Sequence, residues 1–287
     1  MTGAMDYASY WGMKEKPFEE SCDTRFYYES EDHREALDRM LYIVKDRNMN
    51  MGMLTGEVGS GKTITKNVFQ SSLPADGFEV VNTENSNYGF VDLMYDVLCR
   101  ITFRDSRLAL EQEEVRAERG DKYGIMKAFE ARLQALAYDE NRHLVVLFDE
   151  AQQMEDSVLD EIKNLTNLPP QSKNILTVFL VGQPELREKV RRLKQVDQRI
   201  FLRFHLNNLS YDDTVSYVLH RLRAAGLGER ALFTSLGLEY IFRSTGGVPR
   251  EINRLCKMAL TYGAARELSQ IRREELEVIF NDLQEHA

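Results

Sequence analysis

Residues 56–63 decide the fold, because Gly56-Glu57-Val58-Gly59-Ser60-Gly61-Lys62-Thr63 fits the phosphate-loop pattern G-x-x-x-x-G-K-[ST]. Residues 51–55 before the loop are mostly apolar, as expected for a short buried strand. Residues 64–71 after the loop have the composition of a helix. The motif requires this order of strand, loop and helix. A glycine-rich turn with a chance lysine is the alternative, and it leaves the flanking pattern without a reason.

The residue types in this loop suit a triphosphate. Backbone N–H groups can surround the anion, and the positive end of the following helix dipole points at it. Gly59 and Gly61 permit positive φ and place no Cβ near the phosphates. We expect Lys62 to lie between the β- and γ-phosphates and the Thr63 hydroxyl to bind Mg²⁺. The sequence thus predicts ATP and Mg²⁺ as cofactors, with nucleotide contacts from Glu57, Val58, Gly59, Ser60, Gly61, Lys62 and Thr63.

Composition limits the class of protein. A chain of 287 residues suits one large and one small domain. A net charge of −9 argues against a generic nucleic-acid binder, although a local basic patch can still bind DNA. Three widely spaced cysteines, no signal-peptide pattern and no apolar window of about 18 residues predict a cytoplasmic chain without a membrane segment.

Apolar patterning predicts an α/β fold. Helical segments alternate with short apolar strands, which implies a parallel five-stranded sheet sandwiched by helices. Only helical patterns follow residue 209, so we predict a P-loop domain over 1–208, including an extended N-terminal segment, and a small helical lid domain over 209–287. A charge-dense stretch at 104–122 is expected to be a solvated helix or an insertion. The strands are expected at 51–55, 78–81, 144–148, 175–181 and 201–206.

The N-terminal region is aromatic-rich and irregular up to residue 30. Pro17 and the lack of periodicity predict an extended segment packed over the core. Ser30 is expected to be the N-cap of a helix with His33 at its third position.

Two acids follow the apolar run 144–148. Asp149 is expected to hold Mg²⁺ through its water shell, and Glu150 to polarise the attacking water as general base. This is the Walker B arrangement. The alternative is a pair of acids capping the start of a helix.

Further polar residues follow other strands. Gln183 comes directly after the next strand and would lie at the same sheet edge, where it can hold the attacking water or contact the γ-phosphate. The alternative is a turn residue before Pro184. Arg199 and Arg203 flank the start of the last strand, where an arginine can reach the γ-phosphate of a neighbouring subunit, and a surface salt bridge is the alternative for each. Arg250 opens a helix in the small domain, where it can contact the nucleotide.

These motifs together resemble AAA+ ATPases of the GspA/ExeA type over nearly the whole chain. The resemblance implies an ASCE-type sheet, a helical lid and nucleotide-dependent homo-oligomers, as rings or filaments. It makes Gln183 sensor 1, Arg250 sensor 2, Arg199 or Arg203 a finger acting in trans, and residues 28–33, which include His33, a cover for the adenine. The stretches that carry it are the P-loop, Phe148-Asp149-Glu150-Ala151-Gln152, Val181-Gly182-Gln183-Pro184-Glu185-Leu186, Gly247-Val248-Pro249-Arg250-Glu251-Ile252-Asn253, and residues 10–18 and 28–37.

Two functions from different classes follow. The best-known members of that family support type II secretion, with a membrane helix and a peptidoglycan-binding region after the ATPase, neither of which follows within residues 1–287. The same module is similar to transposition regulators of the TnsC, TniB and MuB kind, which polymerise on DNA and recruit a transposase. We therefore expect a DNA-binding switch, with a secretion or pilus-assembly ATPase acting on protein partners as the alternative. A metabolic P-loop kinase is disfavoured, because the C-terminal helical region resembles an AAA+ lid. The candidate DNA-binding residues, which a solvated helix face would also explain, are Lys173, Arg187, Lys189, Arg191, Arg192 and Lys194.

Overall fold

The computed structural model describes residues 6–19, 23–47, 49–84, 87–103, 120–168 and 174–285. Most of the charge-dense stretch predicted at 104–122, and Lys173 of the basic run, lie outside these ranges. Contacts divide the chain into two compact units. The sheet unit comprises Arg34–Glu57 and Val68–Leu206, and the helical unit comprises the residues up to His33, Val58–Asn67 and the residues from Asn207 onward.

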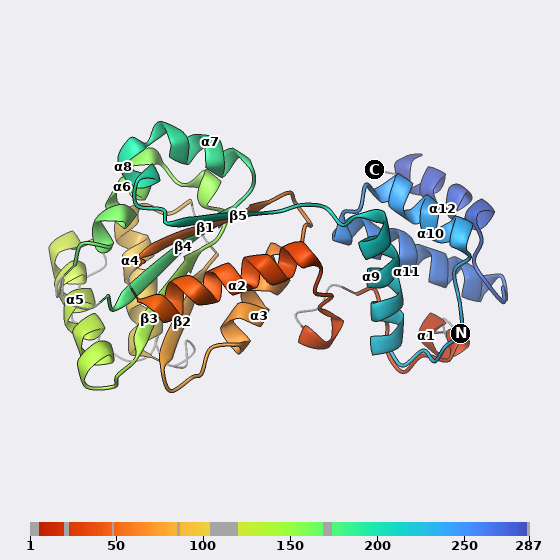
Figure 1. Ribbon diagram of the computed structural model, residues 1–287, viewed down its shortest axis with the longest axis horizontal. Coiled ribbons are helices and arrows are strands. Elements are labelled where there is room, and N and C mark those ends of the chain that lie inside the picture. The colour runs from red at the N-terminus through yellow and green to blue at the C-terminus, as the bar shows by residue number, and fades with distance from the viewer. Residues whose placement is uncertain are drawn as a thin grey trace. The chain divides into compact units, whose positions relative to one another are not determined.

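The sheet unit contains the predicted five-stranded parallel sheet. Its strands are β1 (Met51–Gly56), β2 (Phe78–Thr83), β3 (His143–Phe148), β4 (Leu176–Gly182) and β5 (Leu202–Leu206), and their order is β2-β3-β4-β1-β5 (Figure 1). Thr55 of β1 pairs with Gly182 of β4, and Gly56 pairs with Leu206 of β5. The strands therefore end at one edge, and β1 enters the P-loop there.

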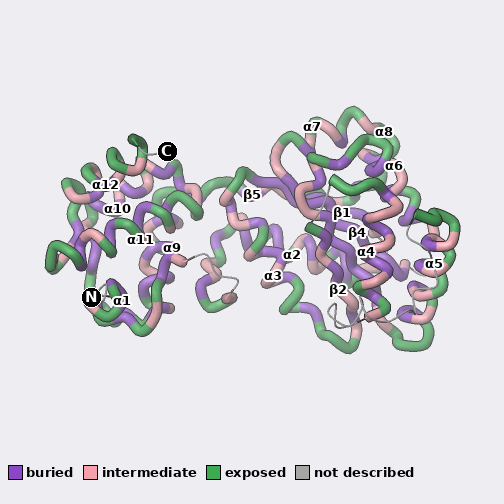
Figure 2. Tube along the Cα trace, turned by 180° about the vertical axis from the view of Figure 1, so that it is seen from behind, coloured by how far each residue is buried: buried purple, intermediate pink, exposed green. Residues whose placement is uncertain are grey.

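Helices cover both faces of this sheet because successive strand side chains point to opposite sides. Val145 and Leu147 lie in the cluster formed with α2 (Glu31–Asp46) and the C-terminal part of α3 (Lys62–Ser71). Val146 and Phe148 lie in the cluster on the other face. Every residue of β1, β3 and β4 is buried (Figure 2), as in a parallel sheet covered on both sides. The second face is covered by α4 (Phe90–Thr102), α5 (Lys122–Tyr138), α6 (Asp156–Leu165), α7 (Glu185–Arg192) and α8 (Lys194–Asp197).

The helical unit combines the two ends of the chain. Aromatic side chains from the N-terminal segment lie in the same core as the C-terminal helices. Trp11 is 1% exposed, and its Nε1 donates to the Leu260 carbonyl at 2.9 Å. The division at 208 stays a prediction, but this segment packs on the C-terminal helices. Those helices are α9 (Tyr211–Ala224), α10 (Ser235–Thr245), α11 (Pro249–Ala265) and α12 (Arg273–Glu285).

The N-terminal segment is not extended throughout. Tyr7–Trp11 forms the helix α1, and Thr24–Phe26 forms the 3₁₀ turn η1. The prediction of an extended chain was wrong at 7–11 because one turn has no measurable period and is set by tertiary packing, here by burial of Tyr7, Ala8 and Trp11.

A buried arginine fixes this segment to α9. Arg221 is 6% exposed, and its Nε donates to the Pro17 carbonyl at 2.6 Å. Its two terminal nitrogens donate to the Glu19 carbonyl at 2.9 Å and to the Tyr217 hydroxyl at 2.8 Å. Burial raises the pKa of Tyr217, so its hydroxyl keeps its proton and donates to Asn253 of α11 at 2.8 Å. The arginine thus links the N-terminal segment, α9 and α11.

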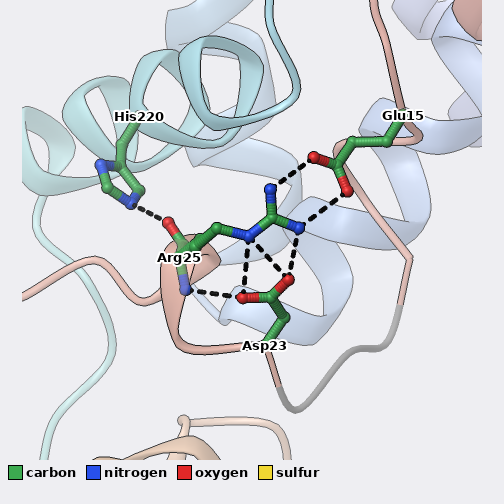
Figure 3. A network of polar contacts seen from close by, with 4 residues as sticks. All are labelled: Glu15, Asp23, Arg25 and His220. Atoms are coloured by element: carbon green, nitrogen blue, oxygen red, sulfur yellow. Dashed lines mark hydrogen bonds and ion pairs between the residues drawn. The ribbon is translucent and has the colours of Figure 1, made fainter.

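A second arginine shapes the turn that follows. The Arg25 guanidinium donates to both Glu15 carboxylate oxygens, at 2.9 and 3.1 Å, and to Asp23 (Figure 3). The His220 ring donates to the Arg25 carbonyl at 3.1 Å. The hydrogen bonds that the Arg25 side chain and backbone donate to Asp23 lower the pKa of that carboxyl. The group is exposed, so it adds little stability, but it fixes the turn that leads to Ser30.

Among the described residues, no helix has both the length and the apolar composition needed to span a bilayer.

Candidate functional site

The P-loop has the backbone conformation that the sequence predicts. Gly59 has φ of +81° and Gly61 has φ of +101°, which confirms the expected positive angles. A Cβ at Gly59 would lie 2.6 Å from the Cβ of Arg250, and one at Gly61 would lie 2.7 Å from Nε2 of His33. Both glycines are therefore required by conformation and by space. Helix α3 begins at Lys62 and has no acidic residue in its first turn.

This loop fits an anionic ligand. The Ser60 hydroxyl is buried and has no hydrogen-bond partner among the described residues. A buried hydroxyl without a partner is costly, and a phosphate oxygen would satisfy it. The start of α3 supplies N–H groups and the positive end of a helix dipole. The hydroxyl of Thr63, in the first turn of α3, is a hard oxygen donor of the kind that Mg²⁺ prefers.

His33 lies against the P-loop backbone. It is 4% exposed, and Ser30, the N-cap of α2, accepts from its backbone N–H at 3.3 Å, as predicted. Nε2 lies 3.2 Å from the Ser60 carbonyl, which can only accept, so this nitrogen carries the proton. Nδ1 then accepts from the Ser30 hydroxyl at 2.7 Å. The imidazole thus supports the loop, and its predicted contact with nucleotide stays a prediction.

Burial lowers the pKa of His33 from its usual value of 6.5, and the hydrogen bond to Ser60 opposes that shift, as do the charges of Asp32 and Asp213. The neutral form is the one that donates from Nε2 and accepts at Nδ1. Unfolded chains take up a proton at this residue near pH 6.5 while the folded chain does not. The stability that His33 contributes is therefore complete above about pH 6.5 and is lost as the pH falls toward the lower folded pKa.

We expect His33→Ala to weaken ATP binding about tenfold, because it removes the hydrogen bond that holds the Ser60 carbonyl of the loop and the one from Ser30 that orients the imidazole, each worth about 1 kcal/mol net. Fluorescent-nucleotide titration measures the affinity. His220→Ala is the matched control, since it removes another hydrogen-bonded histidine of the same unit. Chemical denaturation at pH 7.5 and 5.5 should show a smaller loss of stability in His33→Ala than in the parent. An unchanged affinity would contradict the supporting role.

Arg250 also contacts the loop. It lies in the first turn of α11, whose N-cap is Val248 and whose first residue is Pro249. Its backbone N–H donates to the Gly59 carbonyl at 3.4 Å. The structure therefore brings residues 58–63 of the P-loop, His33 and Arg250 together in the helical unit, and the sensor role of the Arg250 guanidinium stays a prediction.

In the sheet unit, Glu150 and Gln183 are in contact at the ends of β3 and β4. The Glu150 Oε2 accepts from Nε2 of Gln183 at 3.3 Å. Asp149 Oδ1 accepts from the Glu150 backbone N–H at 3.0 Å. Glu150 has φ of +50° and precedes the 3₁₀ turn η2 (Ala151–Gln153), but its side chain makes no capping bond. The helix-capping alternative therefore does not describe Glu150.

Sequence reasoning missed Gln152. Its side chain contacts both Glu150 and Gln183. A Cβ at Gly182 would lie 2.4 Å from its Oε1, so glycine leaves room for the amide. The available signal was an amide two residues after the acidic pair, together with a glycine just before Gln183.

The two candidate finger arginines differ. The Arg203 guanidinium donates to the Asp197 carbonyl at 2.6 Å and to its carboxylate at 2.7 Å. The surface salt bridge weighed as an alternative is therefore present for Arg203. Arg199 is exposed and makes no ion pair within the described residues. The role of either arginine toward a neighbouring subunit stays a prediction.

Comparison with family models identifies the class. The model for the AAA domain matches residues 45–190, about half of the chain, and the match includes the P-loop, Asp149, Glu150 and Gln183. This chain belongs to the AAA domain family. The predicted resemblance to AAA+ proteins is confirmed at that level.

Individual proteins are similar to this AAA protein in sequence or in fold. It is 34% identical over 264 residues to general secretion pathway protein A of Aeromonas hydrophila, and the match covers 91% of this chain but 45% of that protein. The chain thus spans about half the length of that curated relative. The ORC2 protein of Aeropyrum pernix, solved as ADPNP-ADP complexes, has 15% identity and a TM-score of 0.67, covering 93% of this chain and 71% of its own. Cdc6p of Pyrobaculum aerophilum has 15% identity and a TM-score of 0.62, covering 87% and 68%. These structures share the fold.

The AAA protein carries an exposed basic surface on α7 and α8. Arg191, Arg192 and Lys194 are exposed, and none makes an ion pair within the described residues. Lys189 differs, because its Nζ donates to the Met154 carbonyl and pairs with Asp156 at 3.6 Å. We define the basic face as Arg191, Arg192 and Lys194.

Proposed function

We propose that this chain is an ATP-driven switch that binds ATP with Mg²⁺ and hydrolyses it to ADP and phosphate. The observation that supports this most is the P-loop with its two left-handed glycines, its buried Ser60 hydroxyl and the start of α3, whose first turn has no acidic residue. Retention of ATP with Mg²⁺ by the purified chain, followed by phosphate release, tests the proposal.

Each residue has a role in this scheme. The bound nucleotide supplies the γ-phosphoryl group, whose charge Lys62 and the loop N–H groups offset. Thr63 and Asp149 would hold Mg²⁺, with Asp149 acting through water. Glu150 accepts the proton of the attacking water, and Gln183 orients that water. Arg250 would report the nucleotide state to α11.

Hydrolysis would be completed between copies of the chain. We place Arg199 as the finger that reaches the γ-phosphate of a neighbouring subunit, since Arg203 is held by Asp197. The proposal thus requires a nucleotide-dependent homo-oligomer, a ring or a filament.

Double-stranded DNA is the partner we propose, in the manner of transposition regulators of the TnsC, TniB and MuB kind that recruit a transposase. The basic face supports this, because its positive side chains make no ion pair within the described residues, although the chain as a whole has a net charge of −9. Phosphate contacts of this kind release counterions, so affinity falls steeply with salt.

A gel shift tests the DNA proposal. We expect ATP-dependent binding of non-specific duplex at low salt, reduced at least about tenfold in the double variant Arg191→Glu, Arg192→Glu through loss of phosphate contacts. Arg272→Glu is the control, because it reverses the charge of an exposed arginine just before α12, about 80 residues after the basic face in the sequence. Absence of any shift at low salt with ATP would overturn the DNA proposal while leaving the ATPase proposal intact.

An ATPase for secretion or pilus assembly is the second candidate. The relative from Aeromonas hydrophila favours it, because that protein is named for the general secretion pathway. This function predicts nucleotide-dependent oligomers that do not bind DNA and that bind envelope-assembly proteins.

A further inference from the structure

We propose that Gln152 is a positioning residue that fixes the carboxylate of Glu150 and ties it to Gln183. This inference rests on the proposed hydrolysis of ATP. Three hydrogen bonds within the sheet unit support it, and Gln152 is not among the residues to which the proposed function gives a role.

The orientation of the Gln152 amide follows from its partners. The backbone N–H of Gln183 points at Oε1 at 3.0 Å, and an N–H can only donate. The oxygen of the amide must therefore face Gln183. The nitrogen then faces Glu150, and Nε2 donates to Oε2 at 2.6 Å. Both ends of the amide are thus committed, which fixes its rotation.

The turn that carries Gln152 is itself held in place. The Lys189 Nζ donates to the Gln152 carbonyl at 3.3 Å and also to the Met154 carbonyl. Gly182 lets the amide approach β4, since any Cβ there would overlap Oε1. Gln152 is therefore fixed from the α7 side through its backbone and from the β4 side through its side chain.

The two carboxylate oxygens of Glu150 differ in their hydrogen bonds. Oε2 accepts from both Gln152 and Gln183, at 2.6 and 3.3 Å. Oε1 accepts no hydrogen bond that the described residues show. A carboxylate held by one oxygen keeps the other aimed for the proton of a water molecule, which is what a general base requires. Without Gln152, Oε2 of Glu150 keeps only the longer hydrogen bond, the one from Gln183.

The test uses the full chain with three variants. In Gln152→Ala we expect kcat to fall about tenfold with KM unchanged, as for loss of orientation of a general base. Gln152→Glu keeps an oxygen for Gln183 but places a second carboxylate against Glu150. We expect it to lower kcat about 100-fold, because the two like charges repel each other and displace the Glu150 carboxylate. Gln153→Ala, an exposed neighbouring amide, is the matched control.

A second readout does not depend on activity. Without nucleotide, the backbone amide of Gln183 should exchange with solvent faster in Gln152→Ala, which lacks its acceptor, and should stay protected in Gln152→Glu. ATP affinity should be the same in all variants, since the P-loop is intact. Parental kcat in both Gln152 variants would overturn the inference alone. A parent and a Gln153→Ala protein that release no phosphate would overturn the proposed ATPase instead, and the Gln183 exchange rates would still decide whether Gln152 holds this strand end.

Discussion

Lys62→Ala is expected to abolish ATP binding at ordinary concentrations. Lys62 is the first residue of α3 and is only 8% exposed, so most of its side chain is shielded from solvent. Hydrogen bonds to charged groups are worth about 1.5–3 kcal/mol each, so losing the contacts to two phosphates should raise Kd at least about 100-fold. Isothermal titration with ATP and Mg²⁺ measures the change.

Thermal melting gives an independent measure. Saturating ATP, at about 100 times the parental Kd, should stabilise the parent by about 2.7 kcal/mol, and the same ATP concentration should stabilise Lys62→Ala by no more than about 0.4 kcal/mol. Lys45→Ala removes the same charge from the exposed surface of α2 and serves as control. If Lys62→Ala retained parental affinity, the loop would not be a phosphate site.

Glu150→Gln is expected to keep nucleotide binding and to stop hydrolysis. The amide preserves the size of the side chain but cannot take a proton from water, so kcat should fall about 10²–10⁴-fold, the usual contribution of a general base. Because ATP then persists, oligomers that require ATP should accumulate, and size-exclusion chromatography with light scattering would detect them. Equal turnover in Glu150→Gln and the parent would remove the general-base role.

The same variant tests the finger. In mixtures of Glu150→Gln with Arg199→Ala, an interface that joins an intact Glu150 to an intact Arg199 should regain turnover. Arg203→Ala should show no such complementation, because its guanidinium is engaged by Asp197 within its own chain. Complementation by Arg203→Ala and not by Arg199→Ala would reverse the assignment.

The sheet and the loop could be predicted because their signals are local. Strands β1, β3 and β4 are short, mostly apolar stretches, and the P-loop motif fixes its own backbone angles through Gly59 and Gly61. The positions of Asp149, Glu150 and Gln183 at strand ends follow from a parallel sheet.

Other features depend on contacts between distant residues, which one sequence does not reveal. The helix at Tyr7–Trp11 is only five residues long and exists through burial of Trp11 against α11. Gln152 acquires its role from Gly182, thirty residues further along a different element. The difference between Arg199 and Arg203 likewise depends on the position of Asp197.

The hydrogen bond between Trp11 and Leu260 joins residues 249 apart. A ribosome makes the first of them long before the second, so the sheet unit can fold while the aromatic N-terminal segment still lacks its partners. Trp11, Phe18 and Phe26 are then exposed on the nascent chain until α11 emerges. Such apolar segments bind chaperones or aggregate, which makes synthesis of the last helices the step that decides the yield of native protein.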